Sequence, residues 1–322
     1  MADIYDTSPL NSIDCSFGNY LTRRKMMDSK MMDGNGIPNY AFAMDYEFRK
    51  KLDSIPRFFE TAKMITGTYV SRSTHEYNRS SMAVGPTQFP EVYKAACDCA
   101  RTLGIGIPNV FIKNTTEMNA FTLATDDIEP MIVIHSGLME RMTYGELKFI
   151  IGHECGHIQN YHSAYNYLSQ LVLNTGMNVT SGINQMIAAL MTVGSVVWLS
   201  AWSRAAEVTA DRAGMICADD SRDCYSALAK LMYGGMIGDS HEIDYEAIRT
   251  QLDQTVSSIA KYGEVLDTHP AVTRRIAALQ EFNECETYYE WCPDRKTPGQ
   301  LMRAKPETDM RCKRYIDLNK KG

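Results

Sequence analysis

The sequence predicts an α+β fold that is mainly helical. Three short runs rich in β-branched and aromatic residues, separated by turn residues, predict strands at Val110–Lys113, Asn119–Ala124 and Met131–His135. Helices are expected around them: Pro90 to Leu103 is predicted as a helix that ends at Gly104, and an apolar repeat of about 3.6 residues follows Thr143. With 322 residues, of which 44% are hydrophobic, the chain can bury a sizeable core as one large domain or one domain with appendages.

The helix after Thr143 has a clear start signal. Thr143 and Glu146 match the capping-box pattern, in which each side chain bonds to the backbone N–H of the other residue. Four apolar residues then share one helical face: Leu147, Ile150, Ile151 and Ile158. We therefore expect an amphipathic helix through this segment.

Residues 153–157 of that helix read His-Glu-Cys-Gly-His, an HExxH motif. Two histidines four residues apart project from the same face, so His153 and His157 can each give a ring nitrogen to one zinc ion. Glu154 falls inside the apolar stripe, where a carboxylate packed against apolar side chains would be costly. A solvated helix with incidental histidines would place this glutamate on the polar side instead. The motif therefore predicts a zinc site at which Glu154 acts on the metal's open position.

Catalytic zinc usually has three protein ligands, so a third is expected elsewhere in the chain. The Ala-rich segment from Ser203 to Gly214 favours a helix, on which Glu207 and Asp211 share one face. Glu207 can be the third ligand, and Asp211 can accept a hydrogen bond from the free ring nitrogen of a ligand histidine. Taken alone, this segment is better explained by surface ion pairs; beside the HExxH motif, the ligand interpretation is favoured.

These motifs, in this order, resemble those of the gluzincin zinc metallopeptidases of the HtpX-like and CAAX prenyl-protease (Ste24-like) family. That family carries HExxH on one helix and ExxxD on a later helix, matched here by Glu207 and Asp211. The resemblance covers about residues 40 to 282. It implies a zincin-type metallopeptidase domain with a small β-sheet beside the HExxH helix and about one Zn²⁺ per chain.

The resemblance also assigns residues outside the two helices. Asn119-Ala120-Phe121 matches the family's strand beside the cleft. In this chain the segment is either a strand that pairs with an extended substrate or an ordinary edge strand. His269, followed by Pro270, matches the family's histidine-proline motif, which makes it the candidate donor to the oxyanion. Without that match, a histidine at the start of a loop before a proline is the preferred interpretation. Arg275 matches an arginine expected to orient nearby acids, with Asp211 as one candidate.

The chain is expected to divide into an irregular N-terminal arm, a zinc metallopeptidase domain and a basic C-terminal extension, at residues 1–39, 40–285 and 286–322. Within the domain, a helix interrupted by Pro56 is expected over residues 40–66, followed by strands or a loop over residues 69–84.

Composition indicates which kinds of partner and which cellular compartment to expect. A net charge of −6 gives no support for nucleic-acid binding. Nine cysteines show no metal-finger spacing, and an odd number without a secretory signal indicates reduced thiols in the cytoplasm. Cys155, inside the zinc motif, is either an oxidation-sensitive thiol or a small buried hydrophobe.

Residues 183–202 are apolar enough to suggest a membrane span, but polar residues interrupt them. The mainly apolar part, residues 186–199, is fourteen residues long, whereas a span needs about twenty. We therefore expect a buried helix or a peripheral membrane contact, so the protein is cytoplasmic with a membrane association left open. This departs from family members that have several transmembrane helices. The sequence leaves the oligomeric state open.

Together these features predict an endopeptidase that hydrolyses peptide or protein substrates with metal-activated water and Glu154 as general base. The alternative is a non-catalytic zinc protein that uses the cleft to bind peptides or partner proteins. Structural zinc sites are usually closed and rich in cysteine, whereas this motif set provides three ligands and a glutamate.

Overall fold

The computed structural model describes most of the chain, in the residue ranges 31–32, 37–54, 58–125, 128–165, 196–234, 243–245, 247–248, 250 and 270–317. The chain forms two compact units. The first comprises Met1–Asn39, Thr66–Ser163 and Ala210–Ile243, and the second comprises Tyr40–Ile65, Ala164–Thr209 and Asp244–Gly322. Two helices, α3 (Phe58–Ser80) and α9 (Val196–Cys217), contribute residues to both units.

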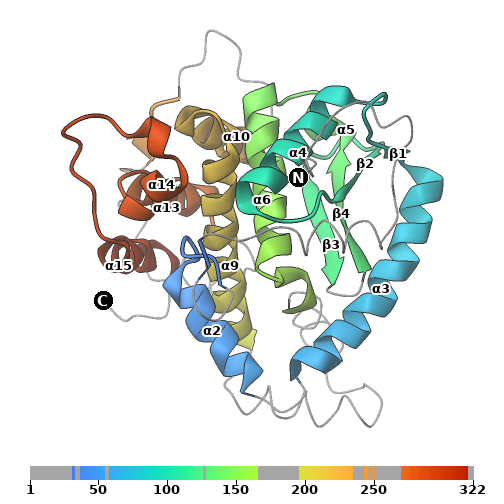
Figure 1. Cartoon of the computed structure of the whole chain (residues 1–322), viewed down its shortest axis with the longest axis horizontal. Helices are drawn as coiled ribbons and strands as arrows, with labels where there is room; N and C mark the ends of the chain where they lie inside the picture. The colour runs from blue at the N-terminus through green and yellow to red at the C-terminus, as the bar shows by residue number, and fades with distance from the viewer. Residues whose placement is uncertain are drawn as a thin grey trace, which may run out of the picture. The chain divides into compact units, whose positions relative to one another are not determined.

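The first unit contains a four-stranded mixed sheet (Figure 1). Its strands are β1 (Met82–Ala83), β2 (Asn109–Lys113), β3 (Ala120–Thr125) and β4 (Ile128–His135). The spatial order is β1-β2-β4-β3, in which β2 and β4 are parallel and the two outer pairs are antiparallel. The three strands that the sequence predicts are confirmed. β4 begins three residues before the predicted Met131, because the pairing of Thr125 with Ile128 continues the ladder toward the connection between β3 and β4.

Among the described residues, the helices that lie wholly in this unit are α4 (Pro90–Leu103), α5 (Ser136–Met139), α6 (Tyr144–Gln159) and α10 (Ser221–Tyr233). The predicted helix end at Gly104 is confirmed: this glycine adopts a left-handed φ of 74° that an L side chain would disfavour.

The expectation of strands or a loop over residues 69–84 is wrong. α3 continues to Ser80, and only Met82 and Ala83 pair as a strand. The β-branched and aromatic residues of this segment carry a weak strand preference that tertiary packing overrides. Tyr77 of α3 contacts the ring of Phe121 at 5.9 Å between centroids, so the helix is stabilised by covering the sheet.

The two faces of the sheet have different neighbours. On one face, Phe111, Met131 and Val133 form a buried cluster against which Tyr77 and Phe121 pack. Side chains alternate along a strand, so the residue after Phe121 faces the other way. On that second face α6 lies against β3 and β4 (Figure 1). Thr122, the residue after Phe121, therefore faces the helix that carries the HExxH motif.

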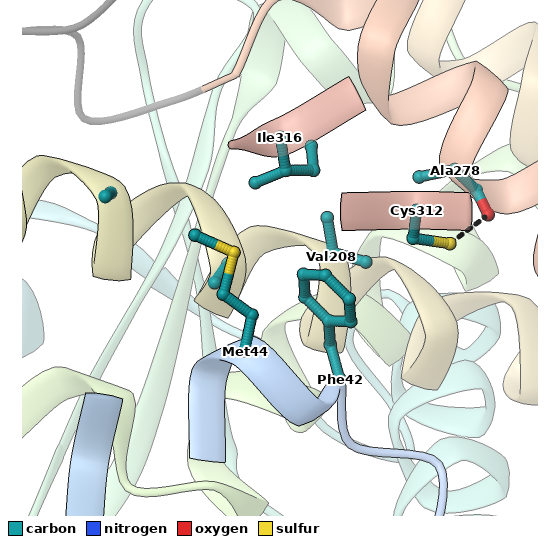
Figure 2. Packing of buried hydrophobic residues seen from close by; sticks show 8 residues of the cluster. Phe42, Met44, Val208, Ala278, Cys312 and Ile316 are labelled. Atoms are coloured by element: carbon teal, nitrogen blue, oxygen red, sulfur yellow. Dashed lines mark hydrogen bonds between the residues drawn. The ribbon is translucent and has the colours of Figure 1, made fainter. Parts of the chain in front are cut away.

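The second unit packs helices around an apolar core (Figure 2). Besides parts of α3 and α9, it contains α2 (Ala43–Asp53), α13 (Val272–Asn283), α14 (Glu286–Trp291), the 3-10 helix η1 (Pro293–Arg295) and α15 (Lys305–Ile316). The core cluster includes Phe42, Met44, Val208, Ala278, Cys312 and Ile316. The Cys312 thiol donates to the carbonyl oxygen of Ala278 at 3.5 Å, so α15 is tied to α13.

A buried acid also anchors α2 to α9 within this unit. Asp45 accepts hydrogen bonds from Trp202 Nε1 at 3.0 Å and from Thr209 Oγ1 at 2.7 Å. Because both carboxylate oxygens have donors, the cost of burying this charge is offset. The contact fixes the part of α9 that carries Glu207 within this unit.

Among the described residues, no helix combines the length and the apolar character that a membrane crossing requires. Of the 183–202 segment, only the residues from Val196 onward are described, and they form the start of α9. The membrane contact predicted for this segment therefore stays a prediction, as does the irregular arm, most of which lies outside the described residues.

Candidate metal centre

The first turn of α6 is fixed by the capping box that the sequence predicts. Thr143 N–H donates to Glu146 Oε2 at 2.7 Å, and Glu146 N–H donates to Thr143 Oγ1 at 3.3 Å. Glu146 is buried and also accepts from Lys230 Nζ at 2.6 Å and Ser226 Oγ at 2.5 Å, both on α10. A buried carboxylate with this many donors is well compensated. The start of the motif helix is therefore held against α10.

Glycines let α6 and the end of α9 approach very closely. A Cβ atom on Gly152 would lie 2.6 Å from Cys217 Cβ, and one on Gly156 would lie 2.6 Å from Ala213 Cβ. On α9, a Cβ on Gly214 would lie 2.8 Å from the ring of Phe149. These separations are shorter than carbon atoms tolerate, so only glycine fits. We call this contact the glycine seam; it sets the distance between the HExxH helix and the end of α9.

Replacing Gly156 by alanine should destabilise the protein, although alanine is the better helix former by about 1 kcal/mol. The added methyl group would overpack the seam, and overpacking typically costs about 1–3 kcal/mol. Urea unfolding of wild type and Gly156→Ala measures the difference. The double variant Gly156→Ala with Ala213→Gly removes the nearest clashing methyl and should recover part of the loss. A single variant at least as stable as wild type would show that the seam is not tight.

The two motif histidines face each other. His153 Nε2 and His157 Nε2 lie 3.1 Å apart, and both side chains are buried. His153 Nδ1 lies 2.9 Å from Asp211 Oδ1, so this ring can donate its Nδ1 proton to the carboxylate and keep Nε2 for a ligand. The seam thus places Asp211 of α9 within hydrogen-bond distance of His153.

Glu207 lies one turn before Asp211 on the same continuous helix, so the contact of Asp211 with His153 also directs Glu207 toward the histidines. His153, His157 and Glu207 each offer one ligand atom, and these three atoms lie within 4.8 Å of one another. Two imidazole nitrogens and one carboxylate are a donor set typical of catalytic zinc, with a fourth position open.

Arg275 lies beside Glu207. Its Nη1 is 3.5 Å from Glu207 Oε2, and both side chains are almost fully buried. The structure shows an ion pair of this arginine with Glu207, while Asp211, the acid that the sequence suggested, stays a prediction. The guanidinium partly balances the charge of a buried carboxylate, which would be costly without a counter-charge.

Glu154 is buried next to the histidines and is held by a residue that the sequence interpretation missed. Thr122 Oγ1 donates to Glu154 Oε2 at 2.7 Å and lies 3.2 Å from the backbone oxygen of Glu154. Thr122 directly follows Asn119-Ala120-Phe121, and side chains alternate along a strand. Strand alternation places Phe121 and Thr122 on opposite faces of β3, but it does not tell which of these faces the motif helix covers.

His162 was also missed. It is fully buried, and its Nδ1 lies 2.8 Å from His157 Nδ1. A histidine five residues after His157 would lie about 140° away from it on a continuing helix, so helical spacing gives no signal. Instead α6 ends at Gln159 and Tyr161 adopts a left-handed φ of 58°, so the position of His162 is set by a turn and not by a continuing helix.

Of the remaining predicted residues, the structure describes those of the substrate strand but not the proposed oxyanion donor. Asn119 precedes β3, and its carbonyl accepts from His135 N–H at 3.0 Å. Ala120 begins β3, and Phe121 packs into the cluster on the face away from α6. His269 lies outside the described residues.

Cys155 is fully buried within α6, and this burial raises the pKa of its thiol. A thiol that stays protonated and shielded from solvent is a poor nucleophile. Of the two interpretations of this cysteine, the structure favours the small buried hydrophobe.

Comparisons with known proteins show what the chain is similar to. Residues 86–283 match the family model described as "Peptidase family M48". Plastoglobule-localized metallopeptidase 48, chloroplastic, from Arabidopsis thaliana is 29% identical over 245 residues, which cover 74% of this chain and 70% of that protein. A protease HtpX homolog from Helicobacter acinonychis is 26% identical over 191 residues, which cover 53% of this chain and 60% of the homolog. The crystal structure of S. mikatae Ste24p matches with a TM-score of 0.41 and 16% identity, over 74% of this chain and 62% of that one.

Proposed function

The chain belongs to peptidase family M48, and from this premise we propose that it is a zinc-dependent endopeptidase in which Glu154 is the general base. One observation carries the proposal: the ligand atoms of His153, His157 and Glu207 lie within 4.8 Å of one another. Glu154 is the neighbour of His153 on the same buried helix, so its carboxylate lies next to the first of these ligands.

The donor set fits zinc. His153 and His157 would bind through Nε2, since these atoms face each other, and Glu207 would complete the set with a carboxylate oxygen. When bound, zinc lowers the pKa of a water ligand toward ~7 and polarises the carbonyl of the bond to be cleaved. We expect about one Zn²⁺ per chain.

The side chains around this set have separate tasks in the proposed reaction. Glu154 accepts the proton of the attacking water at its carboxylate and delivers it to the leaving amine. Thr122 Oγ1 donates to Oε2 of this carboxylate and so holds its orientation. Asp211 holds the ring of His153, and Arg275 holds Glu207. His269 is proposed as the donor that stabilises the oxyanion.

The substrate is proposed to be a peptide or protein that adds a strand to β3, through the segment Asn119-Ala120-Phe121. β3 ends the sheet order among the described strands. The Asn119 carbonyl bonds to β4, so by alternation the backbone groups of Ala120 and Thr122 point away from β4, toward the side where an extended peptide would bind. Ser163 Oγ lies 3.4 Å from the Thr122 carbonyl oxygen, at that same side.

Chelation tests the proposed activity. Purified protein should cleave casein or members of a peptide library, lose this activity with 1,10-phenanthroline and recover it when Zn²⁺ is restored. The reason is that the open position of the metal is where the reaction takes place. Mass spectrometry of the products identifies the cleaved bonds. Cleavage that persists after complete metal removal would indicate a contaminating or metal-independent peptidase.

A preparation that binds zinc but cleaves nothing would support the alternative, a non-catalytic zinc protein that binds peptides or partner proteins.

The localisation stays a proposal as well: cytoplasmic, with a peripheral membrane contact through residues 183–202. The name of one relative places that protein at plastoglobules, which is consistent with a contact of this kind.

A further inference from the structure

His162 contacts a proposed metal ligand from the side opposite to the metal. Its Nδ1 lies 2.8 Å from His157 Nδ1, and the planes of the two rings are inclined at 70°. At the other end of the same ring, His157 Nε2 faces His153 Nε2 at 3.1 Å. His157 is therefore held between a ligand position and a buried second histidine.

The protonation of this pair follows from its geometry. If His157 binds metal through Nε2, its neutral ring carries the proton on Nδ1. That N–H is buried and needs an acceptor, because an unpaired buried donor costs free energy. His162 Nδ1 lies in reach, and it can accept this proton only if His162 carries its own proton on Nε2. The contact thus selects one tautomer of each ring.

We propose that His162 is a positioning residue that fixes the tautomer and ring orientation of His157 and thereby strengthens zinc binding; this rests on the zinc site of the proposed function. The contact corresponds to that of Asp211 with His153, where a carboxylate accepts from Nδ1 at 2.9 Å. Each motif histidine then has its own acceptor, an anion for His153 and a neutral ring for His157. Loss of such an acceptor typically weakens metal affinity by about 10–100-fold.

Two substitutions separate hydrogen bonding from packing. His162→Leu keeps a side chain of comparable bulk but removes the acceptor. His162→Asn loses part of the ring but retains an amide oxygen close to the position of Nδ1. His135→Leu is the matched control, because His135 is also buried but lies at the end of β4 against the ring of Phe121, on the face of the sheet away from α6.

Zinc affinity is measured by competition between the full-length protein and a chromophoric chelator, with Zn²⁺ as the only added ligand. All variants are compared with wild type at the same pH. His162→Leu should bind Zn²⁺ about 10–100-fold more weakly than wild type. His162→Asn and His135→Leu should keep most of the affinity. Co²⁺ substitution gives a second readout, since the visible spectrum should change in His162→Leu and not in His135→Leu.

Each outcome decides a different point. Wild-type affinity in His162→Leu would overturn the positioning role. Equal loss of affinity in His162→Leu and His162→Asn, together with lower thermal stability of both, would also overturn it, because the effect would then be one of packing. If wild-type protein itself binds no Zn²⁺, the proposed function fails.

Discussion

Glutamine in place of Glu154 should leave zinc binding and folding nearly unchanged while peptidase turnover falls by at least the ~10²–10⁴-fold expected from losing general acid–base catalysis. Glu154 is not one of the three residues whose ligand atoms converge, so the substitution removes no ligand. A glutamine side chain has nearly the same size, and its amide oxygen can still accept from Thr122 Oγ1. It cannot take up the proton of the attacking water. Turnover of a cleaved peptide, zinc content and thermal stability are measured on the same preparations.

The control for this variant is Glu91→Gln, which makes the same chemical change at an exposed position in the first turn of α4. It should cleave like wild type and lose at most a few tenths to 1 kcal/mol of stability, the usual size of a charge effect at a helix start. If Glu154→Gln cleaves peptides as fast as wild type, Glu154 is not the general base. The metal would then be a structural link between two helices.

Alanine at either of two proposed ligands, His157 or Glu207, should remove most of the bound zinc. Wild-type protein is expected to hold about one Zn²⁺ per chain, and a three-ligand site that loses one ligand retains two donors. Metal content after dialysis, measured by mass spectrometry, reports the loss. Activity should fall together with the metal.

Glu207→Ala also leaves Arg275 without its acidic partner, so a stability control is needed. Removing one member of a buried ion pair can cost about 3–5 kcal/mol. Glu281→Ala is the matched stability control. Glu281 is buried on α13 and pairs with Arg303 at 2.9 Å, but it is not one of the three proposed metal ligands. It should lose stability and keep its zinc. Full zinc content in Glu207→Ala would show that the third ligand lies elsewhere.

The sequence predicted those parts of the centre that depend on spacing along a helix. The capping box follows from the Thr143–Glu146 pattern, and the placement of His153 and His157 on one face follows from the 3.6-residue period. The predicted α+β fold class, mainly helical with a small sheet, is confirmed as well. Helix ends and strand alternation are local features that a few neighbouring residues encode.

The parts that were missed depend on contacts between distant segments. Thr122 reaches Glu154 only because β3 lies against α6, and nothing in the run after Asn119 states which helix covers that face. His162 reaches His157 across a turn at Tyr161, a residue type that seldom adopts a positive φ. α3 was missed over residues 69–80 because a helix that is stabilised by packing on a sheet needs little intrinsic helix preference.

The glycine seam bears on how this centre acquires its metal. In small zinc domains the ion itself holds the ligands together, and such domains unfold when it is withdrawn. Here backbone contact between α6 and the end of α9, reinforced by the buried bonds of Glu146, fixes the helix that carries both histidines. Little of the binding free energy of the ion is then spent on ordering the chain. The metal-free protein would stay folded, and loading would be a reversible exchange whose extent follows the free zinc concentration around it.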